Sequence, residues 1–378
     1  MTGIVYVADS VIPSRQANAV HVMQMCAALA EIGHRVDLVA PDRNRESERD
    51  VLDVWEFYGV PKTFGVSRVA WPYLPYGTQW AFAVGAMRAA ASLDPALIYT
   101  RSLATALVAG VAGMPVLLEA HQPVDVSGRF SERALRTLAR RSELRGLVVI
   151  TQALAAVYEQ GFPELRRRVH VIPDAARPID SSTVPADLGV REGRLQVGYA
   201  GQLYEGRGIQ RILDLARALP SIDFNLVGGL ARDVKSWKER SMALPNVRFA
   251  GFVPPRVVAE YLLAFDVLIA PYEPRVFSAS GQDTTSWMSP LKLFEYMAAA
   301  RPIVTSDLPA LREVVDEGSG IIMCAYDDFD CWVETLSRLS TDPGERTRRG
   351  AQAFDRFSAS YSWRARAERV SQLLLECE

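Results

Sequence analysis

Short apolar runs alternate with longer amphipathic segments along most of the chain. The first run, Ile4–Ala8, carries no charge and is rich in strand-forming residues. The segment after it places apolar side chains at the i, i+4, i+7 and i+8 positions of a helix: Val22, Cys26, Leu29 and Ala30. We expect Gly33 to end that helix and His34–Ala40 to begin the next strand.

The same alternation continues through the first half of the chain and restarts in the second. The remaining strands predicted in the first half are Leu97–Tyr99, Val116–Leu118, Leu147–Ile150 and Val169–Ile172. Those predicted in the second half are Gln196–Ala200, Phe224–Val227, Val247–Phe249, Val267–Ala270, Ile303–Thr305 and Ile321–Met323. Apolar strands separated by helices indicate parallel sheets covered on both faces, which is the doubly wound α/β architecture.

The segment Asp174–Gly193 interrupts this pattern, because it is rich in proline, serine and aspartate and has no periodicity. It predicts a link between two Rossmann-like domains. We expect an N-terminal domain over residues 1–176 and a C-terminal domain over residues 190–361, with the last helix, 362–378, packing back on the first. Ligands of such sheets bind beyond the carboxyl ends of the strands, so two facing domains would form a cleft lined by these loops.

Composition agrees with a folded chain of two domains. The chain has 378 residues, of which 49% are hydrophobic and 23% charged, an ordinary globular balance. A net charge of −2 lacks the basic surplus that favours nucleic-acid binding. The N-terminus has no basic region typical of a signal peptide. The uncharged stretch Ser102–Leu118 is shorter than the ~20 residues of a spanning helix, so a cytoplasmic protein is expected.

The four cysteines, Cys26, Cys324, Cys331 and Cys377, show neither the CxxC spacing of a metal site nor a disulfide-rich pattern. Reduced thiols are therefore expected. Asp328–Asp330 has the form of an acid-x-acid metal pair, but its position before a predicted helix favours capping.

The loop after Gln196–Ala200 is rich in glycine and contains Arg207. Its sequence is Gly201-Gln202-Leu203-Tyr204-Glu205-Gly206-Arg207-Gly208. Glycines let a backbone approach a ligand, a helix N-terminus favours an anion, and arginine supplies a fork of donors. The loop fits a diphosphate site and, equally, a tight turn with a solvated arginine. It lacks the GxGxxG spacing of dinucleotide sites, which disfavours a nicotinamide or flavin enzyme.

A second informative segment is Ser289–Ala298. Ser289 is expected to cap a helix with Pro290 in its first position. Lys292 then lies in the first turn, where a surface helix usually places an acid, and a bound anion would explain this reversal. Glu295 follows three residues later, and its carboxylate could accept two hydroxyls of a ribose. A solvated pair of Lys292 and Glu295 is the alternative.

Several segments together resemble the donor-site signature of glycosyltransferase family 4, and the likeness runs from Val5 to the last helix. The segments that carry it are Val171–Asp174, Val197–Tyr204, Asn246–Val253, Ser289–Ala298, Arg301–Asp307 and Arg312–Val314. Members of this family have the GT-B fold, with two Rossmann-like domains, and are generally metal-independent, retaining enzymes. The resemblance therefore implies no metal and no cofactor, with a UDP- or GDP-linked sugar as the co-substrate.

The resemblance also implies roles for individual residues. The donor-binding residues that it implies are Gly201, Gln202, Arg207, Phe252, Val253, Asp283, Ser289, Pro290, Leu291, Lys292 and Glu295. Arg207 and Lys292 would face the diphosphate and Glu295 would hold the ribose, which makes these three the catalytic candidates of the C-terminal domain. Phe252 and Val253 would border the base.

Some positions depart from the family pattern. Gln202 stands where a basic residue is usual before the glycine-rich turn, and Trp287 stands where the family has an acid. Asp283 could replace that acid in contacting the sugar. The glycine pair after the first strand is missing, and Ser14–His21 there resembles a variant seen in surface-polysaccharide transferases.

The N-terminal domain supplies the acceptor-side candidates. His121 follows the strand Val116–Leu118, at a point where the family has a functional histidine, and it is the catalytic candidate of this domain. From the residues alone, a structural histidine would be the better interpretation. Arg15 and Asn18, from the variant segment, complete the acceptor-side set.

The stretch Arg129–Arg145 contains six arginines against two glutamates. Arg133, Arg136 and Arg140 lie on one helical face. A solvated surface is the simpler interpretation. Contact with anionic lipid or a phosphorylated acceptor is the functional one, and it would place the protein peripherally on the inner membrane face.

These observations predict a metal-independent retaining glycosyltransferase. It would move a sugar from a nucleotide-diphospho-sugar to a hydroxyl acceptor, which could be a glycan, a lipid-linked molecule or a natural product. Two alternatives stay open: a catalytically silent GT-B partner or binding subunit, and a nucleotide-sugar epimerase on the same scaffold. No nucleic-acid partner is expected.

Overall fold

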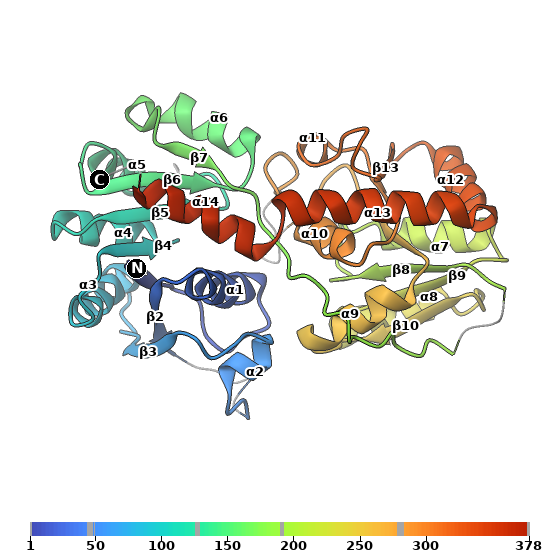
Figure 1. Cartoon of the computed structure of the whole chain (residues 1–378), viewed down its shortest axis with the longest axis horizontal. Coiled ribbons are helices and arrows are strands. Elements are labelled where there is room, and N and C mark those ends of the chain that lie inside the picture. Colours follow the sequence, from blue (N-terminus) through green and yellow to red (C-terminus); the bar gives the residue numbers. More distant parts are fainter. Residues whose placement is uncertain are drawn as a thin grey trace. The chain divides into compact units, whose positions relative to one another are not determined.

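The computed structural model describes residues 2–43, 48, 50–124, 129–189, 193–277 and 283–375. The chain divides into two compact units. The first unit consists of Met1–Pro173 with Trp363–Glu378, and the second is Asp174–Ser362. The last helix, red in Figure 1, therefore lies among the elements of the first unit.

The first unit is built on a seven-stranded parallel sheet in the order β3-β2-β1-β4-β5-β6-β7. Its strands are β1 (Gly3–Val7), β2 (Arg35–Asp42), β3 (Gly65–Ala70), β4 (Leu97–Thr100), β5 (Val116–Ala120), β6 (Leu144–Val149) and β7 (Val169–Val171). The strand order reverses between β1 and β4, as in doubly wound sheets.

Helices connect the strands of the first unit. They are α1 (Ala17–Glu31), α2 (Val54–Tyr58), α3 (Thr78–Ala91), α4 (Leu103–Val111), α5 (Arg129–Ala139), α6 (Gln152–Gly161), the short 3₁₀ turn η2 (Pro163–Leu165) and α14 (Trp363–Leu375). The helix α14 packs against α1. Among the described residues, no helix combines the length and the apolar character that crossing a bilayer requires.

The second unit repeats the design with a six-stranded parallel sheet in the order β10-β9-β8-β11-β12-β13. Its strands are β8 (Gln196–Ala200), β9 (Asp223–Val227), β10 (Val247–Gly251), β11 (Val267–Ala270), β12 (Ile303–Ser306) and β13 (Ile322–Cys324). Its helices are α7 (Ile209–Ala218), α8 (Ala231–Arg240), α9 (Pro255–Ala264), α10 (Leu291–Ala298), α11 (Pro309–Arg312), α12 (Phe329–Thr341) and α13 (Pro343–Ser360). Two doubly wound sheets confirm the predicted fold class.

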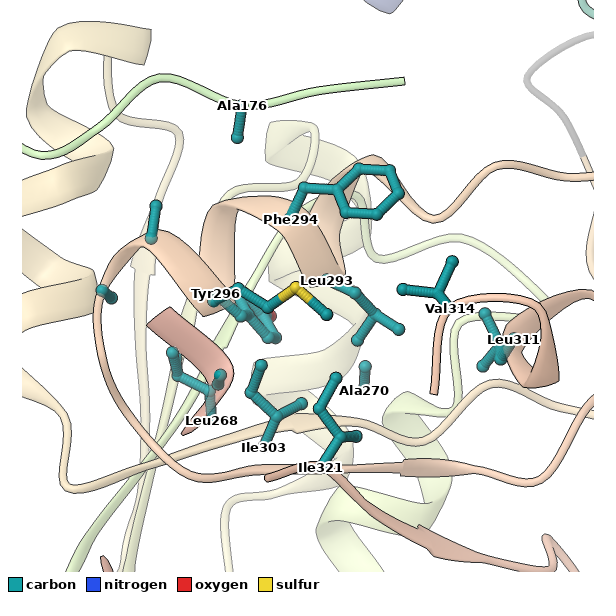
Figure 2. Close-up of a cluster of buried hydrophobic side chains, with 14 of the residues drawn as sticks. Ala176, Leu268, Ala270, Leu293, Phe294, Tyr296, Ile303, Leu311, Val314 and Ile321 are labelled. Carbon is teal, nitrogen blue, oxygen red and sulfur yellow. The ribbon is translucent and has the colours of Figure 1, made fainter. Parts of the chain in front are cut away.

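Apolar clusters cover both faces of the second sheet. On one face, Leu293 and Tyr296 of α10 pack with Leu268, Ala270 and Ile303 of the neighbouring strands (Figure 2). Because the apolar side of α10 packs in the core, the helix cannot rotate, and the positions of its polar side chains Lys292 and Glu295 are set as well.

The structure adds one strand to those that the sequence predicts. The edge strand β3 was not predicted because none of its residues is buried and its sequence has no continuous apolar run. The proline-rich segment after Pro173 is part of the second unit. The amide of Ala176 donates to the carbonyl of Tyr361 (2.9 Å), and that of Ala186 donates to the carbonyl of Glu260 (2.9 Å).

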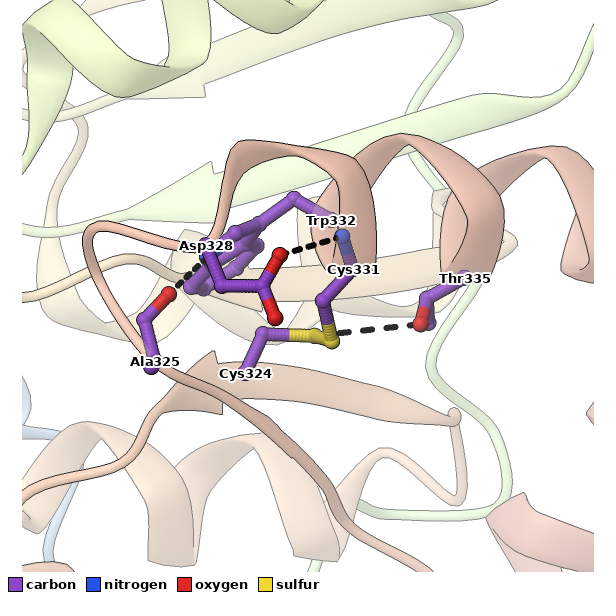
Figure 3. The surroundings of a disulfide bond; sticks show 6 residues. All are labelled: Cys324, Ala325, Asp328, Cys331, Trp332 and Thr335. Carbon is purple, nitrogen blue, oxygen red and sulfur yellow. Dashed lines mark hydrogen bonds between the residues drawn. A yellow bond between two sulfur atoms is a disulfide. The ribbon is translucent and has the colours of Figure 1, made fainter.

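The expectation of four reduced thiols is wrong for two of them, because Cys324 and Cys331 form a disulfide (Figure 3). Their Cα atoms are 5.9 Å apart, a separation that a disulfide spans. The bond joins the end of β13 to the first turn of α12. Asp328 caps that helix by accepting from the Cys331 amide (3.0 Å), which confirms capping at Asp328–Asp330.

Candidate donor and acceptor sites

The glycine-rich loop is a tight turn between β8 and α7, and α7 begins at Ile209 as predicted. Gly208 has φ +73°, and a Cβ there would lie 1.6 Å from the carbonyl oxygen of Pro271. Only glycine allows this approach. Gly201 has φ +146°, and a Cβ there would lie 2.9 Å from the Nζ of Lys292. The glycine therefore makes room for the lysine.

Lys292 extends from the first turn of α10 into an aromatic surrounding. Its Nζ lies 3.7 Å from the ring centre of Tyr199 and 5.4 Å from that of Tyr272. This nitrogen is buried and makes no hydrogen bond to the residues that the structure describes. Desolvation and the nearby Arg207 hold the pKa of Lys292 well below its usual range, with Glu295 opposing them.

Arg207 adds a second cation from the glycine-rich loop. Its guanidinium donates to the hydroxyl of Tyr204 (3.0 Å) and to the carbonyl of Phe277 (3.4 Å). It also lies 5.7 Å from the ring centre of Tyr272, which Lys292 shares. Two positive groups held by aromatic rings rather than carboxylates form a site complementary to an anion.

Glu295 lies one turn after Lys292 on α10. Burial by the surrounding protein raises the pKa of Glu295 to about 7, and Lys292 acts in the opposite direction. The side chain nevertheless keeps more than a third of its surface exposed, so solvent limits the strength of this effect. Within the described part of the chain, Lys292 and Glu295 form no direct ion pair, because the Nζ of Lys292 is buried without a hydrogen-bond partner. The two groups nevertheless interact electrostatically.

The predicted cap of α10 is wrong. Pro290 is the N-cap residue, the helix begins at Leu291, and no side chain caps it. The hydroxyl of Ser289 instead accepts from the amide of Asp174 (3.2 Å), a residue far away in sequence. The amide of Leu291 donates to the carbonyl of Ser289 (3.0 Å).

Two other predicted donor residues, Gln202 and Asp283, belong to the same unit, and each has partners close to it in sequence. Gln202 is exposed, and its carbonyl accepts from the hydroxyl of Tyr199 (2.6 Å). Asp283 accepts from the Thr285 hydroxyl (2.6 Å) and from Arg275 (3.0 Å), which hold its pKa below the usual range. The carboxylate is thus engaged within its own loop.

A pocket of about 500 Å³ lies where β9 and β10 end. Its lining includes Lys235, Met242 and Phe252, and Phe252 is 45% exposed. Val253, the other residue predicted to border a nucleotide base, is half-buried and packs against the core on the α10 side.

In the first unit, His121 lies directly after β5 and hydrogen-bonds through Nε2 to Glu119. Glu119 also pairs with His21 and Arg366. Imidazoles and a carboxylate are metal-ligand types, but the guanidinium of Arg366, 2.9 Å from the same Glu119 oxygen, disfavours a further cation there. The sequence did not single out Glu119, although a lone acid closing an apolar strand was a signal.

The other acceptor-side candidates are also paired. Asn18 of α1 accepts from Arg101, which follows β4. Arg15 pairs with Glu48 (2.6 Å). Asn18 and His121 both follow carboxyl ends of strands, where a doubly wound sheet binds ligands.

Two arginines of the basic stretch are neutralised locally. Arg136 pairs with Glu132 (3.0 Å) and with Glu164 (3.2 Å), and Arg140 pairs with Glu164 (3.2 Å). Arg133 on the same helix is exposed. The excess positive charge of this surface is therefore smaller than the sequence suggests.

The two doubly wound units define the GT-B class of fold, and solved structures agree. The chain is similar over its whole length to sucrose-phosphate synthase from Thermosynechococcus elongatus, with a TM-score of 0.72, 17% identity and 99% of that chain covered. It is also similar to Anabaena HepE in complex with UDP, with a TM-score of 0.70 and 15% identity over 99% of this chain and 100% of the other.

Family comparisons give the more specific result. Residues 19–176 match the sequence model of "Glycosyltransferase Family 4", and residues 194–342 match that of "Glycosyl transferases group 1". The chain belongs to glycosyltransferase family 4. A curated relative is TuaH of Bacillus subtilis, described as a teichuronic acid biosynthesis glycosyltransferase, which is 26% identical over 153 residues. That match spans 39% of this chain and only 37% of the relative's length.

Proposed function

We propose that this protein is a glycosyltransferase that moves a sugar from a nucleotide-diphospho-sugar to a hydroxyl acceptor. The observation that carries the proposal is the buried ammonium of Lys292 beside Arg207, with no carboxylate among its hydrogen-bond partners. A charge buried in this way is costly unless a ligand supplies the counter-charge. A nucleoside diphosphate would do so, and HepE, whose fold this chain shares, has been solved with UDP and with UDP-glucose.

The positive groups also suggest how the reaction proceeds without a metal or another cofactor. Charge develops on the diphosphate as it leaves, and preorganised cations in a desolvated site stabilise that charge. In this proposal Arg207 and Lys292 stabilise the leaving diphosphate, and Glu295 holds the ribose. The pocket beside Phe252 would take the base of a UDP- or GDP-linked donor.

Between the two ways of retaining the anomeric configuration, front-face attack fits the carboxylates better than a double displacement through a covalent intermediate does. Asp283 is engaged with Thr285 and Arg275, and Glu119 is buried among its own partners, so neither is placed as a nucleophile. We therefore propose retention by front-face attack, assisted by the departing phosphate. Analysis of the product anomer tests it: an inverted product contradicts it, and loss of activity in a chelator contradicts metal independence.

Exposed aromatic side chains support a lipid-linked acceptor. Tyr73 and Tyr76, between β3 and α3, are 73% and 91% exposed, and Phe130 at the start of α5 is 62% exposed. The ring of Phe130 contacts that of Trp80 near the start of α3, with 5.0 Å between centroids. Aromatic groups beside basic ones such as Arg133 are typical of membrane interfaces.

Peripheral membrane contact can be tested by sedimentation with anionic vesicles. The protein should cosediment, and replacing Tyr73 and Tyr76 with serine should weaken binding severalfold. Val157→Ser, at an exposed apolar residue of α6, is the matched control and should leave binding unchanged. Equal binding of the tyrosine variant and the wild type would contradict the proposal.

The enzyme proposal itself is tested with UDP-, GDP-, dTDP- and CMP-sugars, by release of nucleoside diphosphate and mass spectrometry of the product. Release coupled to sugar transfer is expected for a UDP- or GDP-linked donor. The engaged Asp283 and the bulky Trp287 favour a second candidate, a donor-binding protein without turnover. Stabilisation by donor without release would support that candidate, and conversion of donor without acceptor would indicate an epimerase.

A further inference from the structure

Glu119, the penultimate residue of β5, is a carboxylate that is only 1% exposed and lies among several donors. Its Oε1 lies 2.9 Å from the Nε2 of His21 and 2.9 Å from a guanidinium nitrogen of Arg366. The Nε2 of His121 hydrogen-bonds to the same oxygen, and the hydroxyl of Tyr99 donates to the other. A carboxylate can accept from all of these donors only when it is ionised, because a protonated carboxyl group has to donate a hydrogen bond itself.

The charge on Glu119 follows from this surrounding. Burial raises the pKa of Glu119, but the charge of Arg366 and the two histidines outweigh it and hold the pKa well below its usual range. A buried anion of this kind accepts hydrogen bonds and donates none.

Arg366 fixes the carboxylate from the far end of the chain. It lies on α14, is 1% exposed, and also donates to the carbonyls of Ile172 and Pro173. The guanidinium of Arg366 therefore links α14 both to Glu119 and to the backbone just after β7, where the segment Met1–Pro173 ends. The carboxylate cannot turn away from His121 without breaking these contacts.

The ring of His121 is held on a second side as well. It meets the ring of His21 edge-on, with centroids 4.8 Å apart, and His21 in turn contacts Trp363 of α14 at 5.0 Å. His21 is buried, whereas the side chain of His121 is 17% exposed. Of the two histidines, His121 is therefore the one that can contact a ligand.

We propose that Glu119, anchored by Arg366, is a positioning residue that fixes the orientation and the tautomer of His121. Because the ionised Glu119 can only accept a hydrogen bond, the neutral ring carries its proton on Nε2, donates it to Glu119, and offers Nδ1 as an acceptor. His121 would then accept a hydrogen bond from a sugar hydroxyl of the substrate rather than donate one. The substrate part of this inference rests on the proposed function, and the tautomer part does not.

The tautomer is measured directly by two-bond ¹H–¹⁵N correlation spectra of the ¹⁵N-labelled wild-type chain, at a pH where the ring is neutral. The proposal expects the His121 signals of the Nε2–H form. Signals of the Nδ1–H form, or a comparable mixture of the two, would overturn it. This result stands whether or not the protein transfers sugar, so it separates a failure of this inference from a failure of the proposed function.

Kinetics supply the second measurement. Glu119→Gln preserves the shape of the side chain but lets an amide donate to the ring, so it should shift the tautomer and lower kcat by about tenfold to a hundredfold. The KM for the donor should stay within about twofold. Glu159→Gln on α6 is the matched control, since it makes the same chemical change outside this cluster and should leave tautomer and kcat unchanged. Unchanged kcat and tautomer in a folded Glu119→Gln protein would overturn the proposal, and if that variant does not fold, the wild-type spectrum decides.

Discussion

Single residues show two opposite ways of burying charge in this chain. In the first unit, Glu119 and Arg366 are buried together and satisfy each other. In the second unit, Lys292 is buried beside Arg207, which carries the same charge. The first arrangement supplies its own counter-charge. In the second, Glu295 offsets the positive charge only in part, and we propose that a bound anion supplies the rest.

Replacing Lys292 by methionine should stabilise the free protein. The variant removes a desolvated ammonium and keeps the packing against Tyr199, so the free energy of unfolding should rise by about 1 kcal/mol or more. Urea denaturation measures this change. Lys62→Met, at an exposed site of the first unit, is the control and should not raise stability. A destabilised Lys292→Met protein would show that the lysine serves the fold.

Glu295 should make stability depend on pH. Because its pKa is raised from 4.5 to about 7, the native state binds more protons than the unfolded state between these values. Stability should therefore fall as the pH rises through this window, and Glu295→Gln should flatten the decline. Melting temperatures measured from pH 4.5 to 7 check this. The same slope in both proteins would assign the effect to another group.

Donor binding should depend on the same titration with the opposite sign. The ribose hydroxyls need the ionised carboxylate as acceptor, so affinity for a nucleoside diphosphate should increase as the pH rises through about 7. In Glu295→Gln that increase should disappear. Affinity that falls through this range in the wild type would contradict a ribose-binding role.

Among the elements, the loop between β8 and α7 depends most on individual glycines. Gly208→Ala should destabilise the second unit by about 3 kcal/mol, because it combines a positive φ with a clash against the Pro271 carbonyl. Gly201→Ala should cost less stability but more donor affinity, since it displaces the flexible Lys292. Gly33→Ala, with φ +97° and open space around it, measures the backbone strain alone. Equal donor affinity for Gly201→Ala and the wild type would contradict the assignment.

The disulfide between β13 and α12 can be tested chemically. Peptide mapping without reductant should recover a Cys324–Cys331 linkage, and Cys324→Ser should lower stability by about 2 kcal/mol. The buried Cys26, whose thiol pKa burial raises, should react with alkylating agents only after unfolding. Quantitative alkylation of Cys324 and Cys331 in the native protein would contradict the bond.

Local sequence patterns predicted the elements better than the contacts between them. The glycine-rich turn and the lysine in the first turn of α10 are local signals, and the structure places both as expected. The cap assigned to Ser289 was wrong because its hydroxyl serves Asp174, 115 residues away. Glu119 was missed because its partner Arg366 is 247 residues away. Such partners follow from the tertiary fold alone.

For the whole molecule, the two units have separate cores, and the first depends on a helix from the end of the chain. Val370 of α14 is fully buried, so Val370→Asp should unfold or loosen the first unit. Hydrogen exchange should then increase in β1, β4 and β5 but stay unchanged in β8 and β11. Glu368→Ala, exposed on the same helix, is the control. Equal loss of protection in both units would show that they do not fold as separate units.

The net charge of −2 conceals the feature on which the functional account depends. The central claim is that Lys292 and Arg207 form a site for a nucleoside diphosphate in the second unit. Calorimetric titration of UDP and GDP into the wild type and Lys292→Met tests this claim most directly. We expect the wild type to bind at least one of the two, and Lys292→Met to bind it at least about tenfold more weakly, a loss of about 1.4 kcal/mol. Equal affinity in the two proteins, or no binding to the wild type, would contradict it.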